Sequence, residues 1–108
     1  MGLFKPGTGS ANGSFVGEQE KNVLIFNKVA FPINKVVLDT GGQYGAQYLI
    51  ETVLPGSDES RVIGFKADSV PNRAEGLQAI IDMQEAGTYE PITVCLVKDG
   101  RATLIEEV

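Results

Sequence analysis

Residues 61–97 read RVIGFKADSVPNRAEGLQAIIDMQEAGTYEPITVCLV, and this stretch decides the fold. Strand-like runs lie at its two ends, over residues 61–67 and 92–97. Between them, Asn72 followed three residues later by Glu75 forms a capping-box pattern that predicts the start of a helix. Gly87 is placed to end that helix in the left-handed conformation. The stretch therefore predicts one helix between two strands.

Three further segments have the pattern of strands, and they cover residues 35–40, 47–54 and 102–105. The breaks between strands carry turn signals, namely Gly41-Gly42, Pro55-Gly56-Ser57-Asp58 and Asp99-Gly100. A long apolar stretch begins at Asn22 and is broken by Pro32, which lacks a backbone donor. We interpret it as a bent first strand, or as two short strands that meet near Phe31 and Pro32.

Five strands with one helix between the third and the fourth predict a mainly β fold, namely a five-stranded OB-fold barrel over residues 22–108. Such barrels commonly bind oligonucleotides or oligosaccharides across strands two and three and the adjoining loops. Residues 1–21 form a glycine-rich N-terminal arm in this scheme. The arm is expected either to cover a sheet edge of its own domain or to pack on a neighbouring subunit through Phe4 or Phe15. The second arrangement predicts a homo-oligomer.

The charge of the chain bears on its partner. Nine basic and fourteen acidic residues give a formal net charge of −5, which weighs against a nucleic acid. A phosphate chain nevertheless responds to the local field of its groove rather than to net charge. Several basic residues lie on or beside the expected strands, where the fold can gather them into one patch. They are Lys35, Arg61, Lys66, Lys98 and Arg101.

The composition gives little support to catalysis. The sequence has no histidine, and histidine is the commonest general base and metal ligand. The single cysteine, Cys95, lies in an apolar run and is expected to be a packing residue. From the apolar pattern we expect neither a secretory signal nor a spanning segment. We therefore expect a cytoplasmic protein that is not an enzyme and uses no cofactor or metal.

The aromatic residues are candidates for stacking on nucleic-acid bases. Tyr44 lies in the glycine-rich loop between the first two expected strands, where an OB-fold presents one wall of its groove. Tyr48 shares a strand face with Ile50, and Phe65 shares one with Ile63. For Tyr48 and Phe65 the pattern leaves two alternatives open, a place in the groove and a place in the core.

The segment VLDTGGQYGAQYLIE (residues 37–51), followed by RVIGFK (residues 61–66) and the helix-hairpin ending, resembles small OB-fold single-stranded DNA-binding proteins, particularly bacteriophage types. Such proteins coat exposed single strands in DNA replication and recombination. The resemblance implies a bacterial or phage-infected host cell. It also implies stacking by Tyr44, Tyr48 and Phe65 and phosphate contacts from the five basic residues named above.

The tight hairpin expected around Asp99-Gly100 is shorter than the finger loop that such proteins often have. The groove is then short, and several subunits have to act together to bind a strand tightly. The alternative function is an OB-like structural or protein-interaction module, such as a phage assembly component. In that case the arm reaches a neighbour and the acidic surface avoids DNA.

Overall fold

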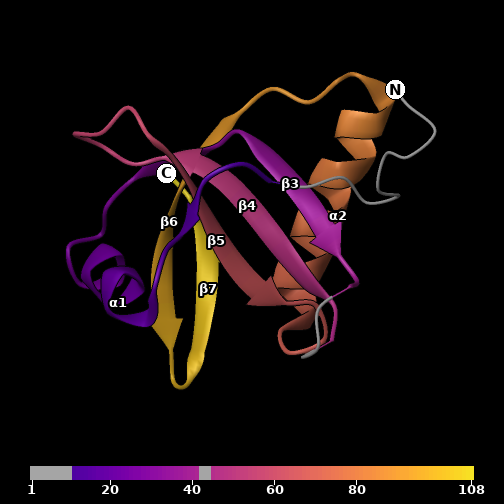
Figure 1. Ribbon diagram of the computed structural model, residues 1–108. Helices are drawn as coiled ribbons and strands as arrows, with labels where there is room; N and C mark the ends of the chain where they lie inside the picture. Colours follow the sequence, from indigo (N-terminus) through magenta and orange to yellow (C-terminus); the bar gives the residue numbers. More distant parts are fainter. Residues whose placement is uncertain (1–10, 42–44) are drawn as a thin grey trace.

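The structure is a computed structural model that describes residues 11–41 and 45–108 (Figure 1). The fold is mainly β, with two helices in the described part of the chain. The strands are β1 (Ser14–Phe15), β2 (Phe31–Ile33), β3 (Lys35–Asp39), β4 (Gln47–Val53), β5 (Ser60–Lys66), β6 (Ile92–Asp99) and β7 (Ala102–Glu107). The helices are α1 (Glu18–Phe26) and α2 (Pro71–Ala86).

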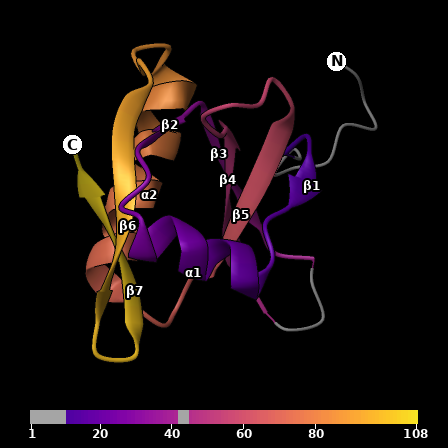
Figure 2. The ribbon, with the colours of Figure 1, turned by 90° about the vertical axis from the view of Figure 1, so that its left-hand side faces the viewer.

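The strands form two sheets, which Figure 2 shows as separate layers. One sheet has the order β1-β5-β4-β3, and the other has the order β2-β6-β7. All pairs are antiparallel except β1 with β5. Only Asn34 separates β2 from β3, so one bent chain passes from the second sheet into the first. The expected bend between two short strands is present, but it lies at Asn34 rather than near Phe31 and Pro32, and the first of the two strands begins only at Phe31.

The five expected strands are present as β3 to β7, with small differences at their ends. The expectation of five strands and one helix is nevertheless wrong, because β1, β2 and α1 are additional elements. Residues 22–26 belong to α1 and not to a strand. The apolar run misled the prediction because a short continuous run has no periodicity that separates a strand from a helix. In α1 only Leu24 is buried, whereas Val23 and Phe26 face outward.

Helix α2 begins two residues earlier than the sequence predicts. Its N-cap is Val70 and its first residue is Pro71, so the expected capping box of Asn72 and Glu75 is wrong. Proline is favoured at the first helical position because its fixed φ suits the helix and its missing N–H would have no partner there. The predicted end is confirmed, because Gly87 follows the helix with a φ of 76°.

The expected closed barrel does not form, since β7 does not pair with β5 within the described residues. The guanidinium of Arg73, from the first turn of α2, lies between these two strands. Its Nη1 donates to the Thr103 carbonyl of β7 at 2.6 Å, and its Nη2 donates to the Lys66 carbonyl of β5 at 3.3 Å. A side chain thus occupies the position where a ladder between the two strands would close the barrel.

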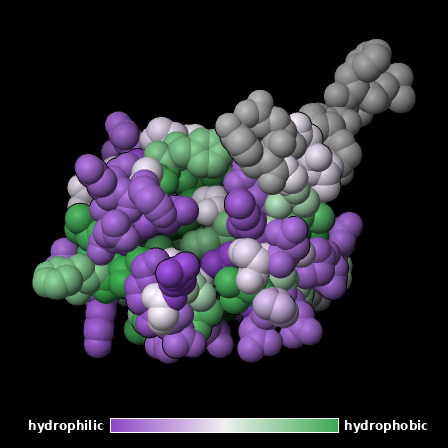
Figure 3. Space-filling view, turned by 90° about the horizontal axis from the view of Figure 1, so that it is seen from below, coloured by the Kyte–Doolittle hydropathy of each residue, from purple (hydrophilic) through white to green (hydrophobic). Residues whose placement is uncertain are grey.

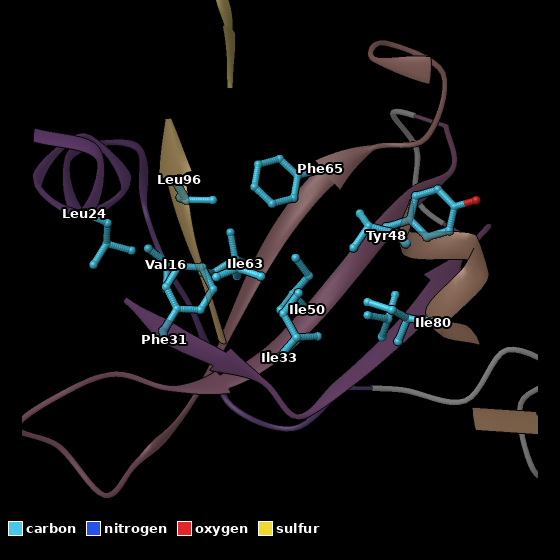
Figure 4. Close-up of a cluster of buried hydrophobic side chains, with 13 residues drawn as sticks. Val16, Leu24, Phe31, Ile33, Tyr48, Ile50, Ile63, Phe65, Ile80 and Leu96 are labelled. Carbon is cyan, nitrogen blue, oxygen red and sulfur yellow. The ribbon is translucent and has the colours of Figure 1, made fainter. Parts of the chain in front are cut away.

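The main core lies between the two sheets and is completed by both helices (Figure 4). Its largest fully buried side chains are Phe31, Ile33, Ile50, Ile63 and Leu96. Burying one such side chain stabilises the fold by about 1.5–3 kcal/mol. A smaller cluster of Val37, Leu49 and Val62 lies on the other face of the first sheet, next to Ala11. In the described part of the chain, neither helix has the length and apolar character needed to cross a membrane.

Candidate anion-binding pocket

A pocket of about 520 Å³ opens between α1, the end of β5, the start of α2 and the β6–β7 hairpin. Among the residues that the structure describes, five of the nine basic residues of the chain line it, together with a single acidic residue, Glu18. The five are Lys21, Lys66, Arg73, Lys98 and Arg101. Figure 3 views the molecule from the hairpin end and shows hydrophilic residues around a hollow. An acidic protein thus has a local basic site, which we call the basic pocket.

The ring of Phe65 lines this pocket from the core side, and two cations stand over it. The Arg73 Cζ lies 4.4 Å from the ring centroid, and the Lys21 Nζ lies 5.2 Å from it. Both distances are within the range of cation–π attraction, which is worth about 0.5–1 kcal/mol at exposed sites and more where water is excluded. The ring is 5% exposed, so these contacts lie at the boundary between core and pocket.

Lys21 and Arg73 also hold the walls of the pocket in place. The Lys21 ammonium donates to the Gly64 carbonyl at 3.1 Å. Besides its bonds to β5 and β7, the Arg73 guanidinium donates to the Ser69 Oγ at 3.0 Å. Burial lowers the pKa of Arg73, but an arginine in a protein keeps its charge. These two residues have a structural part in the pocket and contribute to its positive field.

Lys66, Lys98 and Arg101 have the opposite character. All three are exposed, and no ion pair among the described residues involves them. Lys66 ends β5, Lys98 lies near the end of β6, and Arg101 lies in the turn before β7. Three cations that the sequence analysis proposed as phosphate contacts therefore meet at one pocket with their charges unneutralised. A bound anion gains most from charges of this kind.

The other two proposed cations lie elsewhere. Arg61 forms an ion pair with Glu20 at 2.9 Å and donates to the carbonyls of Ser14 and Phe15. Hydrogen bonding between the two side chains raises the pKa of Arg61 and lowers that of Glu20. Arg61 therefore fastens β1 to β5. Lys35 lies on β3, two strands away from β5 in the sheet, and does not line the pocket.

Tyr48 and Phe65 lie opposite each other on β4 and β5, on the core face (Figure 4). Tyr48 is 7% exposed, and its hydroxyl donates to the Gln78 Oε1 at 2.9 Å. The sequence left open whether these two rings lie in a groove or in the core, and both lie in the core. The next pair of residues on this face, Ile50 and Ile63, is fully buried and makes the same surface apolar. Tyr44 lies outside the described residues.

Sequence reasoning missed Lys21 and Arg73. Lys21 fell in the segment assigned to the arm, because α1 was not foreseen. Arg73 belongs to the expected helix, where the sequence pattern does not indicate contact with two strands. The general tendency that applies is that a long side chain in the first turn of a helix can reach back toward the preceding strand, and Arg73 lies in that turn, three residues after Val70.

No known family model, curated protein or solved structure matches this chain. The site therefore has to be interpreted from its own geometry.

Proposed function

We propose that this protein binds single-stranded DNA, without catalysis and without strong sequence preference, and that the basic pocket contacts the phosphates. The observation that carries the proposal is the gathering of five of nine basic residues at one pocket in a chain of net charge −5. Three of these cations, Lys66, Lys98 and Arg101, are exposed and unpaired within the described part. A local positive field of this kind attracts a polyanion regardless of net charge.

The connectivity of the strands supports the same proposal. Neighbouring strands follow one another in the order β5, β4, β3, β2, β6 and β7, where β2 and β3 are the two halves of one bent chain. This is the order of an OB-fold in which the third and fifth strands do not pair. The basic pocket lies at the third strand of that scheme and at the hairpin of the last two. OB-folds commonly bind oligonucleotides across this region. The likeness bears on function only as analogy.

Burial of Tyr48 and Phe65 supports contact of the pocket with phosphates rather than stacking of these two rings on base faces. Neither ring offers an open face, so base stacking in this proposal falls to Tyr44 in the loop between β3 and β4. Three exposed cations provide a short binding site. We propose that several subunits of a homo-oligomer act together on one strand, because linked weak sites gain affinity through effective concentration. A role in replication or recombination, in a bacterium or a phage-infected cell, belongs to the same proposal.

A second candidate function is a protein-interaction module, such as a phage assembly component. It is favoured by two exposed apolar side chains on α1, Phe26 at 86% and Val23 at 54% exposure. They lie three residues apart and therefore share a helix face. This apolar face is separate from the basic pocket.

The test is a fluorescence titration of labelled oligo-dT with the full chain at several salt concentrations. The triple variant Lys66→Gln, Lys98→Gln, Arg101→Gln should bind more weakly and with a shallower logarithmic salt dependence. The slope should change by about 2, since each phosphate contact on a single strand contributes about 0.7. The matched control is Lys28→Asn, which removes one charge outside the pocket at a residue with a φ of 50° that asparagine tolerates. Equal affinity and slope in the triple variant and the wild type would overturn the proposal.

A further inference from the structure

Side chains form hydrogen bonds with backbone groups at the edges of two sheets. On β3, the Gln84 amide accepts from the Val36 N–H and donates to the Val36 carbonyl, both at 2.8 Å. On β2, the Tyr89 hydroxyl donates to the Ile33 carbonyl. The edge of β5 is covered by β1 at Arg61 and Val62. Unpaired edges invite pairing with another chain, so these contacts protect the fold from such pairing.

The outer edge of β7 is treated differently. In an antiparallel pair, the backbone N–H and C=O groups of every second residue point toward the partner strand. The Val108 N–H donates to the Thr93 carbonyl, so the groups of Leu104 and Glu106 point toward β6 as well. Those of Thr103, Ile105 and Glu107 point to the other side. Arg73 takes the Thr103 carbonyl. Among the described residues, no partner strand or side chain takes the backbone groups of Ile105 and Glu107 on that side.

An apolar cleft of about 430 Å³ lies beside this open edge, between α2 and the core face of β6 and β7. Ile105 and Glu107 form its β7 wall, and Leu77, Ile80 and Ile92 are among the apolar side chains that line it. A volume of this size accommodates one large side chain or a small ligand. The cleft is separate from the basic pocket and shares only Arg73 with it.

Gly76 marks the hollow in the α2 wall. It lies inside the helix, where glycine is about 1 kcal/mol less favourable than alanine. A Cβ placed at Gly76 would meet nothing within 4 Å, so close packing does not require glycine there. The missing side chain leaves the cleft open where Gly76 lines it. The glycine has a local cost in helix stability, and it leaves space in the cleft that a side chain would fill.

The charges around the cleft select the occupant. Two exposed carboxylates, Glu90 and Glu107, line it. No ion pair within the described ranges involves either of them. The cation among its lining residues, Arg73, already donates to the Thr103 and Lys66 carbonyls. A second copy of this chain carries a net charge of −5 and does not complement these carboxylates. A positively charged occupant is complementary.

We infer that β7 and this cleft form a docking site for an extended peptide of a partner protein. The peptide adds as a strand to β7 and pairs with the backbone groups of Ile105 and Glu107. One large apolar side chain enters the hollow at Gly76. A lysine or arginine two residues away, on the same face of the added strand, meets Glu90 and Glu107. Strand addition of this type takes affinity from backbone pairing and specificity from the alternate side chains.

The test titrates the isotope-labelled full chain with the blocked peptide acetyl-Thr-Leu-Thr-Lys-Thr-amide and follows amide resonances. Binding should shift the amides of Gly76, Ile105 and Glu107 and slow hydrogen exchange at the Ile105 N–H. The variant Gly76→Leu fills the hollow and should weaken binding about tenfold or more, the effect of excluding an apolar side chain from its pocket. Ala79→Leu enlarges an exposed residue of the same helix outside the cleft and should bind as the wild type does.

A second pair of measurements tests the charge. A peptide with glutamate in place of lysine should bind more weakly to the wild type, and Glu107→Lys should reverse that preference. The inference is overturned if millimolar peptide shifts none of the three amides. It is also overturned if Gly76→Leu binds as tightly as Ala79→Leu, or if shifts appear at the edge of β3 instead of β7.

Discussion

The guanidinium of Arg73 lies 4.4 Å from the centroid of the Phe65 ring and donates hydrogen bonds to the strands on either side of the opening between β5 and β7. One side chain therefore holds together two strands that do not pair. It covers the core at Phe65 and shapes the basic pocket. The stability of the fold and the shape of the site depend on the same residue.

Replacement of Arg73 tests this relationship. Arg73→Met keeps an apolar stem but leaves the Thr103 and Lys66 carbonyls without their donor. We expect the free energy of unfolding in urea to fall by about 2 kcal/mol, because part-buried acceptors lose a charged partner. Arg73→Lys should recover little of the loss, since one ammonium does not reproduce the planar fork. Arg101→Met, an exposed arginine of the same pocket, should change stability by no more than about 0.5 kcal/mol.

Tyr44 is the remaining candidate for stacking on bases. If it stacks on a base, Tyr44→Ala should weaken oligo-dT binding by roughly 1–3 kcal/mol while the circular dichroism spectrum is retained. Tyr48→Ala serves as the contrasting variant. Tyr48 is a core residue, so its removal should lower the melting temperature. Unchanged DNA affinity in folded Tyr44→Ala would leave phosphate contacts as the sole binding mode.

The docking of β1 on β5 should be sensitive to Gly13. This residue has a φ of 132°, and a Cβ placed on it would lie 2.3 Å from the Ser60 carbonyl oxygen. Gly13→Ala should therefore release β1 and accelerate hydrogen exchange at the Val16 N–H, which donates to the Val62 carbonyl at 2.8 Å. Gly41→Ala has room for a Cβ and should leave that exchange unchanged. Equal exchange in both variants would contradict the steric argument.

The Glu20–Arg61 ion pair predicts a weak dependence of stability on pH. Its partner lowers the pKa of Glu20 below the ordinary value of 4.5 in the folded state. The contribution is therefore present above pH 4.5 and is lost as the pH falls through the lower folded value. Wild type should exceed Glu20→Gln in melting temperature at neutral pH, and the difference should vanish in acid. The pair is exposed, so the difference should be small and should shrink in high salt.

Gln84 provides a test of edge protection. Gln84→Ala removes both hydrogen bonds from the Val36 backbone and should destabilise the protein by about 1–2 kcal/mol in urea unfolding. Glu85→Ala changes the exposed neighbour on the same helix and should have an effect of less than about 0.5 kcal/mol. If the two variants are equally stable, the amide does not stabilise the β3 edge.

The sequence by itself determined the elements whose signals are local. Alternating patterns and turn residues predicted the strands β3 to β7, because strand and turn preferences act over a few residues. Gly87 predicted the end of α2, because a left-handed residue there favours glycine. The tight hairpin between β6 and β7 follows from Asp99 and Gly100 in the same way.

Tertiary structure alone decided the relationships between distant segments. Tyr48 and Phe65 became core residues because the second sheet and the helices cover that face of the first sheet, a choice that alternation within a strand leaves open. Lys21 and Arg73 line the basic pocket from two helices. Arg61 forms an ion pair with Glu20 and does not line it. The opening between β5 and β7 is bridged by the Arg73 guanidinium, which donates to a carbonyl of each strand. Such contacts join residues far apart in the chain, so their energies have no counterpart in a local sequence pattern.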